Sequence, residues 1–246
     1  MAGSLDGRVA VVTGASRGIG RGVALAFARA GAHVVAVART QGALEELDDE
    51  IQALGGAATL VPVDLKDFDA LDRMGAALNE RWGRLDILFA NAGILGGLAP
   101  LGHYSPAVWD DVMAVNVTAN WRLIRSLDPL LRASGSGRAI FVSSGAAHSC
   151  KAYWGAYAVS KAALEALART YAAETATTPV KVMLVNPGPL RTRMRRAAMP
   201  GEDPATLRTP AEFAPHVLRL ASPDWTETGK LYDFRQGRVL GFGLPA

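Results

Sequence analysis

The sequence lacks the features that mark disulfide-linked, metal-binding, membrane-spanning and secreted proteins. Its 246 residues include a single cysteine, Cys150, so no internal disulfide can form, which is typical of a reducing compartment. Cysteine and histidine do not cluster with the spacing of a metal site. No apolar run approaches the roughly 20 residues that span a bilayer, and the first residues, MAGSLDGRVAVVTG, lack the pattern of a signal peptide. We therefore expect a cytoplasmic protein that needs no metal.

The sequence also lacks an excess of charge of one sign. Its 26 lysines and arginines nearly balance 23 acidic residues, and the arginines are scattered except in RTRMRR, 191–196. Nucleic-acid surfaces concentrate basic residues in one patch or stripe. We therefore predict neither a nucleic-acid nor a membrane partner. No shift in composition divides the chain, so one compact domain over residues 1–246 is expected.

What the chain does have is an alternation of two hydrophobic periods. β-branched runs typical of strands buried on both faces lie at 8–14, 33–38, 58–64, 85–93, 138–144 and 180–188. Between them, apolar residues three and four apart indicate helices at 19–31, 42–56, 69–83, 106–135 and 155–176. The alternation predicts an α/β fold, a doubly wound parallel sheet with helices on both faces.

The first predicted strand ends in a glycine-rich turn, TGASRGIG, 13–20. Ligands of such sheets bind beyond the carboxyl ends of the strands. Glycines at a strand-to-helix turn let the backbone approach a pyrophosphate, and the start of a helix favours negative charge. The spacing of Gly14, Gly18 and Gly20 differs from the usual G-x-G-x-x-G, so a simple tight connection is the alternative.

The segment GAYAVSKAAL, 155–164, places Tyr157 and Lys161 four positions apart, on one face of a helix. A phenol titrates near pKa 10, and an adjacent ammonium lowers that value by favouring the phenolate. We therefore expect Lys161 to make Tyr157 a usable acid or base. Taken alone, such a pair is more often part of a solvated helix face.

Five motifs in order resemble the short-chain dehydrogenase/reductase family over nearly the whole chain. TGASRGIG matches the family's T-G-x-x-x-G-x-G, and ANAG, 90–93, resembles its Asn-Asn-Ala-Gly segment. The others are Asn116 in VNVTAN, Ser144 thirteen residues before Tyr157, and NPGPLRT, 186–192. The resemblance implies a Rossmann-type NAD(P)-binding domain with a substrate loop near 190–210. It also implies reversible hydride transfer between a nicotinamide and a carbonyl or secondary alcohol.

The resemblance assigns roles to particular residues. Tyr157 would exchange the proton, Ser144 would hydrogen-bond the substrate oxygen, and Lys161 would also hold the nicotinamide ribose. Asn116 would anchor a water of the proton relay. Cofactor contacts are implied for Gly14, Ser16, Arg17, Gly18, Ile19, Gly20, Arg39, Asp64, Leu65, Asn91, Ala92, Gly93, Tyr157, Lys161, Pro187, Gly188, Leu190 and Thr192.

The end of the second predicted strand, VVAVART, bears on the choice of cofactor. A carboxylate there would bind the ribose 2′-hydroxyl of NAD, but the sequence has Ala38 and Arg39. Arg39 and Arg17 suit a 2′-phosphate, so we expect NADP(H) to be preferred over NAD(H), unless both are plain surface arginines. An NAD-linked alcohol dehydrogenase and a non-catalytic NADP(H) sensor are the alternative functions. Asp64 would contact the adenine amino group, or it would cap the following helix.

Three further expectations concern surfaces. The helices near 106–133 and 155–176 pair subunits in relatives, and a second apolar stripe on both predicts a homodimer or homotetramer. Arg193, Arg195 and Arg196 would attract an anionic substrate group, or would belong to a solvated loop. The histidines at 103, 148 and 216 lie outside the motifs and are expected to be surface or packing residues. The C-terminal stretch TGKLYDFRQGRVLGFGLPA departs from the family's usual last strand.

Overall fold

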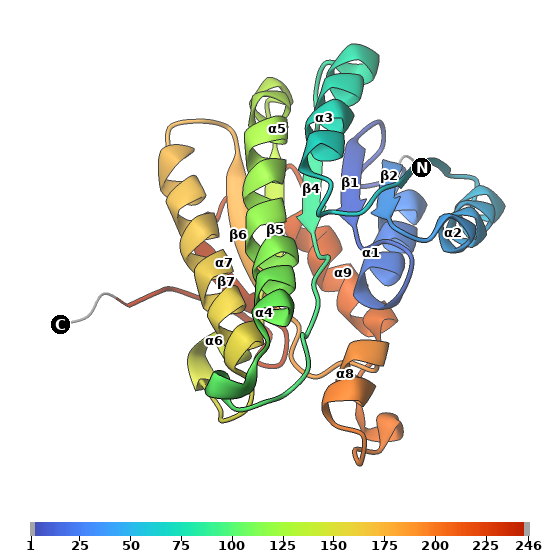
Figure 1. Cartoon of the computed structure of the whole chain (residues 1–246). Helices are drawn as coiled ribbons and strands as arrows, with labels where there is room; N and C mark the ends of the chain where they lie inside the picture. The colour runs from blue at the N-terminus through green and yellow to red at the C-terminus, as the bar shows by residue number, and fades with distance from the viewer. Residues whose placement is uncertain (1–2, 244–246) are drawn as a thin grey trace.

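The computed structural model describes residues 3–243 and shows one twisted sheet covered by helices on both faces (Figure 1). In the described region the sheet has eight strands in the order β3-β2-β1-β4-β5-β6-β7-β8, and only β8 runs antiparallel to its neighbour. The predicted doubly wound α/β fold is therefore confirmed. The strands are β1 (Val9–Thr13), β2 (His33–Ala38), β3 (Ala57–Pro62), β4 (Ile87–Ala90), β5 (Arg138–Val142), β6 (Lys181–Asn186), β7 (Lys230–Asp233) and β8 (Arg238–Leu240).

The helices divide into two layers. One face carries α1 (Gly18–Arg29), α2 (Gln41–Ala53) and α9 (Pro210–Leu220), and the other carries α3 (Phe68–Trp82), α4 (Pro106–Met113), α5 (Ala119–Ala133) and α7 (Gly155–Glu174). Alternate residues of β1 enter the two cores: Ala10 and Val12 pack under the first layer, Val9 and Val11 under the second. The continuous apolar runs of the central strands follow from this burial on both faces.

The structure differs from the predicted elements in two places. The helix expected over 106–135 contains a π-helical turn, Ala114–Thr118, between α4 and α5. The region after 190, expected only as a loop and an atypical tail, forms the short helix α8 (Arg193–Ala198), then α9, β7 and β8. Helix α9 begins with a capping box between Thr209 and Glu212, which stabilises its first turn although Pro215 lies inside the helix.

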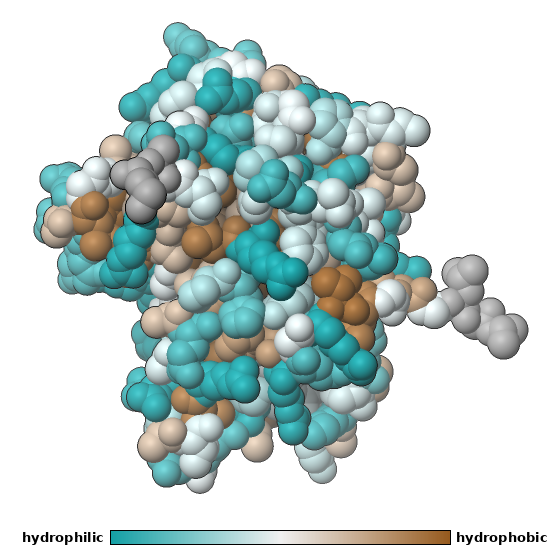
Figure 2. Space-filling model, turned by 180° about the vertical axis from the view of Figure 1, so that it is seen from behind, coloured by the Kyte–Doolittle hydropathy of each residue, from teal (hydrophilic) through white to brown (hydrophobic). Residues whose placement is uncertain are grey.

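The surface shows where apolar side chains remain exposed. On the face that carries α1 and α9 they form separate spots within a mostly hydrophilic surface (Figure 2). On the other layer Trp121 of α5 and Val159 of α7 are exposed, on the two helices expected to pair subunits. The homo-oligomer stays a prediction. Within residues 3–243 no helix has the length and apolar character needed to cross a membrane.

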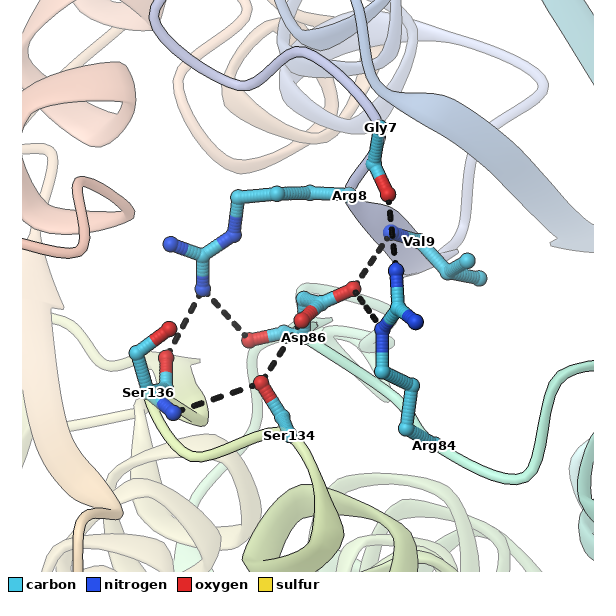
Figure 3. A network of polar contacts seen from close by, with 7 residues as sticks. All are labelled: Gly7, Arg8, Val9, Arg84, Asp86, Ser134 and Ser136. Carbon is cyan, nitrogen blue, oxygen red and sulfur yellow. Dashed lines mark hydrogen bonds and ion pairs between the residues drawn. The ribbon is translucent and has the colours of Figure 1, made fainter.

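A buried polar network ties the strands together at their amino ends (Figure 3). The Asp86 carboxylate accepts hydrogen bonds from the Val9 amide at 2.8 Å and the Ser134 hydroxyl at 2.6 Å. The neighbouring Arg8 guanidinium donates to the carbonyl oxygens of Asp86 and Ser136. Burial lowers the pKa of Arg8, and Asp86 opposes that effect. The network therefore balances a buried cation against a buried carboxylate.

We expect Asp86→Ala to lower the free energy of unfolding by about 3 kcal/mol, because it leaves the Val9 amide and the Ser134 hydroxyl without their acceptor and removes the negative charge beside the buried Arg8. Asp72→Ala serves as the matched control, since Asp72 pairs with Arg122 and Arg125 at a partly exposed position and should cost less than about 1 kcal/mol. Urea unfolding at one protein concentration measures both. Equal losses in the two variants would contradict a special role for the buried network.

Candidate active site

The predicted site residues gather at the carboxyl edge of the sheet. The turn after β1 and the loops after β4, β5 and β6 all leave this edge, which lies toward the lower part of Figure 1. In the same region lie α8 and the short helix α6 (Ala146–Ser149). Because parallel strands all end on one side, motifs spread from residue 13 to residue 192 meet there.

The glycine turn depends on close backbone contacts. Gly14 and Gly18 have φ angles of 66° and 57°, in the left-handed region that favours glycine. A Cβ on Gly20 would lie 2.2 Å from the Gly14 carbonyl oxygen, so no larger residue fits. Asn91 supports the turn, since its side-chain amide donates to the Thr13 carbonyl at 2.9 Å. The turn and the segment after β4 are thus built as one unit at the start of α1.

The structure brings Ser144, Tyr157 and Lys161 together. Helix α7 presents Tyr157 and Lys161 on one face, and the Lys161 ammonium lies 5.7 Å from the centre of the Tyr157 ring. Lys161 Nζ donates to the Val142 carbonyl at 2.7 Å, at the end of β5 and two residues before Ser144. Tyr157 and Lys161 are both buried. A solvated helix face, the alternative interpretation, is therefore wrong.

Burial sets the protonation of this pair. It raises the pKa of Tyr157, and the neighbouring Ser144 hydroxyl opposes the rise. The expected net fall of this pKa is therefore wrong in direction, because desolvation of the phenolate is the largest effect on Tyr157. Burial also lowers the pKa of Lys161 to about 8, against the attraction of Glu165. At neutral pH the phenol keeps its proton and is equipped to donate it.

Asn116 lies in the π-helical turn and is completely buried. Its side chain exchanges two hydrogen bonds with the backbone of Ile94, at 2.8 and 2.9 Å, and donates a third to the Ser160 hydroxyl. A Cβ on Gly93 would lie 3.2 Å from Asn116 Oδ1 and 3.6 Å from Lys161 Nζ, so Gly93 lies close to both side chains. Through these hydrogen bonds Asn116 connects the loop after β4 to α7. The relay water stays a prediction.

The cations expected to bind a 2′-phosphate are accessible. Arg17 is exposed just before α1, and Arg39 is exposed after β2, with its Nη1 3.8 Å from Asp64 Oδ2. Asp64 is not the cap of α3, because Asp67 fills that position and accepts from the Ala70 amide. The capping alternative for Asp64 is therefore wrong. Its Oδ1 accepts from the Lys66 amide at 3.0 Å, so the carboxylate is held at the strand edge, next to the buried Leu65.

The loop after β6 carries the remaining predicted site residues. Asn186, which the motifs did not single out, accepts from the amides of Gly145 and Gly188, both at 3.1 Å, and so joins the loops after β5 and β6. Thr192 caps α8, and its methyl group would lie 3.6 Å from a Cβ on Gly18. Thr192 therefore lies beside the glycine turn, as a cofactor contact requires. Pro187 and the buried Leu190 flank this connection.

The arginine-rich segment is less free than its sequence indicates. Arg195 makes two hydrogen bonds to the Glu202 carboxylate, at 2.5 and 2.6 Å, and Arg191 donates to the Pro204 carbonyl. These residues, with Arg193 and Arg196, line a cavity of about 310 Å³. The expectation of three available cations is wrong for Arg195, because Glu202 neutralises it. An anionic substrate group stays a prediction that rests on Arg193 and Arg196.

His216 and His148 differ in the residues that they contact. His216 packs in the interior layer, where its ring contacts the Tyr232 hydroxyl at 2.6 Å, as expected for a packing residue. His148 instead contacts the buried Glu165 carboxylate on α7. No sequence motif marks this pair, because the contact joins the short helix α6 to a position of α7 that fits an ordinary amphipathic pattern. Within residues 3–243 no group of histidine, cysteine and acidic side chains has the arrangement of a metal site.

The edge as a whole fits a dinucleotide. Gly14 and Gly20 in the turn that begins α1 have no room for a Cβ, exposed Arg17 and Arg39 follow β1 and β2, and Thr192 lies beside Gly18. Lys161 makes a hydrogen bond only to Val142 among the described residues, which leaves ammonium protons for further acceptors. The donors and the open backbone are those that phosphates and a ribose need.

Comparison with known proteins gives consistent matches. The family model described as short chain dehydrogenase matches residues 8–203. The uncharacterized oxidoreductase YciK of Escherichia coli K12 is 38% identical over 241 residues, covering 96% of this chain and 95% of that protein. The rhamnolipids biosynthesis 3-oxoacyl-[acyl-carrier-protein] reductase of Pseudomonas aeruginosa is 38% identical, with 86% and 83% covered. A short chain dehydrogenase from Shigella flexneri 2a, solved in complex with NADP, has a TM-score of 0.91 and 36% identity, with 95% and 99% covered.

Proposed function

Since the chain belongs to the short-chain dehydrogenase family, we propose that it is an NADP(H)-dependent oxidoreductase that interconverts a carbonyl and a secondary alcohol. The observation that carries the proposal is the buried phenol of Tyr157 beside Ser144 and Lys161, at the edge where the glycine turn lies. The P. aeruginosa relative, a 3-oxoacyl reductase, supports reduction of a carbonyl.

The cofactor, when bound, supplies the hydride for reduction or accepts it in oxidation. In this chain Gly14, Gly18 and Gly20 would receive the diphosphate, and Arg17 with Arg39 would hold the 2′-phosphate. Lys161 would donate to the ribose with the protons that Val142 leaves free. The NADP complex of the S. flexneri neighbour supports this choice of cofactor.

The residues of this chain move and hold the proton. Tyr157 donates its phenolic proton to the carbonyl oxygen in reduction, and the Ser144 hydroxyl stabilises the negative charge that develops there. The Lys161 ammonium stabilises the phenolate that Tyr157 becomes, since an opposite charge favours the ionised form. Burial raises the pKa of Tyr157, so the phenol stays protonated until it donates its proton to the carbonyl oxygen.

A panel of ketones, aldehydes and 3-oxoacyl thioesters tests the proposed function directly. We expect loss of NADPH absorbance with at least one carbonyl class, and slower turnover with NADH. Binding of NADPH without turnover of any panel member would favour the sensor instead. The panel needs both small and bulky members, because exposed Leu101 and Tyr153 lie in the loops after β4 and β5.

The protonation of Lys161 predicts a pH dependence. A lysine whose pKa is lowered to about 8 is cationic below that pH and neutral above it. Reduction needs the cation beside Tyr157, so kcat/KM for reduction should be highest near neutral pH and fall above about pH 8. A pH–rate profile with saturating NADPH measures the alkaline limb. A rate that keeps rising to pH 10 would contradict the assignment.

A further inference from the structure

Three consecutive residues at the end of β5 each contact a different residue on one face of α7. Val142 accepts from Lys161, Ser144 lies beside Tyr157, and between them Ser143 donates to Glu165 Oε1 at 2.5 Å. Lys161 and Glu165 follow Tyr157 by four and eight positions, so the three side chains lie along one stripe of the helix. The third contact belongs to no motif that the proposed mechanism uses.

Glu165 is a buried carboxylate with a defined set of partners. Its side chain is 7% exposed, whereas that of its second partner, His148 on α6, is 53% exposed. His148 Nε2 lies 3.0 Å from Glu165 Oε2 and 3.1 Å from Oε1, and the Ser143 hydroxyl donates to Oε1. Burying a carboxylate is unfavourable unless hydrogen bonds or an opposite charge offset its lost hydration. The available opposite charge inside the site is Lys161, whose protonated form Glu165 favours.

We propose that Glu165 is a positioning residue for the active site. Its carboxylate favours the cationic form of Lys161, and its contact with Ser143 keeps the adjacent Ser144 beside Tyr157. This inference rests on the proposed roles of Lys161 and Ser144. The lysine is neutralised neither by Val142, an uncharged acceptor, nor by Tyr157, which is protonated. Glu165 lies one helical turn beyond Lys161 on the same stripe of α7, and its charge favours the protonated lysine against the effect of burial.

The other charged groups around Glu165 have partners elsewhere or face away. Arg169, one turn further along α7, lies over the ring of Phe242 at 4.5 Å. From α5, Asp128 faces α7 but pairs with Tyr171 and Arg132. His148 on α6 is the remaining titratable neighbour, and its exposed ring connects the buried carboxylate to solvent. The charge balance at Lys161 thus depends chiefly on Glu165.

The test is a direct titration of Lys161 that needs no turnover. The chain has five lysines, so protein labelled with ¹³C-lysine gives few Cε signals, and Lys161→Met identifies the one of interest. We expect a midpoint near pH 8 for Lys161 and a fall of about one pH unit in Glu165→Gln, because an opposite charge nearby is removed. Glu174→Gln, at an exposed position on the same helix, is the matched control and should leave the midpoint unchanged. An unchanged midpoint in Glu165→Gln would overturn the proposal.

A second pair of variants separates charge from position. Both Glu165→Asp and Ser143→Ala keep a carboxylate near Lys161, but the first lengthens and the second breaks the contact to the end of β5. We therefore expect kcat to fall about tenfold while the pH midpoint of the Lys161 titration is unchanged. If both variants keep the full kcat, the positioning role is wrong. If Glu165→Gln does not fold, these two variants decide that role. If the unaltered enzyme reduces no carbonyl, the proposed function fails, while the titration still tests the link between Glu165 and Lys161.

Discussion

Tyr157→Phe should lower kcat for carbonyl reduction by about 10²–10⁴-fold and leave binding of NADPH nearly unchanged. The substitution removes only the hydroxyl of Tyr157, which burial keeps protonated at neutral pH and which is proposed to donate to the carbonyl oxygen. The ring remains, so the packing of Trp154 against Tyr157 is kept. Steady-state rates and a fluorescence titration with NADPH measure the two effects separately.

Tyr171→Phe is the matched control for this variant. Tyr171 is also a buried tyrosine on α7, but its hydroxyl donates to Asp128 Oδ1 at 2.8 Å, away from Ser144. We expect some loss of stability, since Asp128 loses a hydrogen bond, and unchanged kcat per folded enzyme. Comparable losses of kcat in both variants would mean that the helix is disturbed in general, and Tyr157 would no longer be assigned as the acid.

Much of this site could be predicted because its motifs lie at the ends of strands. Val, Ile and Ala runs predicted β1, β2, β4, β5 and β6, and the order of a doubly wound sheet brings their carboxyl ends to one edge. TGASRGIG and the pair Tyr157 and Lys161 therefore met where expected. The sequence did not predict α9, β7 and β8, because each has a local pattern that is interrupted or short. Pro215 interrupts the pattern of α9, and β7 and β8 are too short to show a clear period.

The electrostatics of the site could not be predicted in the same way. The spacing of Tyr157 and Lys161 shows that they share a helix face, but not how much water reaches them. Burial decides the sign of both pKa changes, and burial depends on how α7 packs against β5 and the π-helical turn. The contact between His148 and Glu165 joins the short helix α6 to a position of α7 seventeen residues later, beyond the reach of helical spacing.

The choice of cofactor predicts the second large effect. Arg39→Asp should lower kcat/KM for NADPH by about 100-fold and raise it for NADH. A charge-assisted hydrogen bond to the 2′-phosphate is lost, and the new carboxylate repels the phosphate while accepting from a 2′-hydroxyl. Asp64 strengthens the repulsion, because its carboxylate already lies 3.8 Å from the Arg39 guanidinium and would lose that cation.

Arg39→Gln separates the loss of attraction from the gain of repulsion. Glutamine removes the cation without adding a carboxylate, so kcat/KM for NADPH should fall about tenfold and that for NADH should hardly change, with Arg17 still in place. Arg29→Asp, an equal charge reversal at the far end of α1, controls for the change in net charge and should alter neither value per folded enzyme. If all three variants keep the same NADPH-to-NADH ratio, the 2′-phosphate is held by other residues. If only Arg39→Asp changes the ratio, the change comes from repulsion by the introduced carboxylate, and a contact from Arg39 does not set the preference of the unaltered chain.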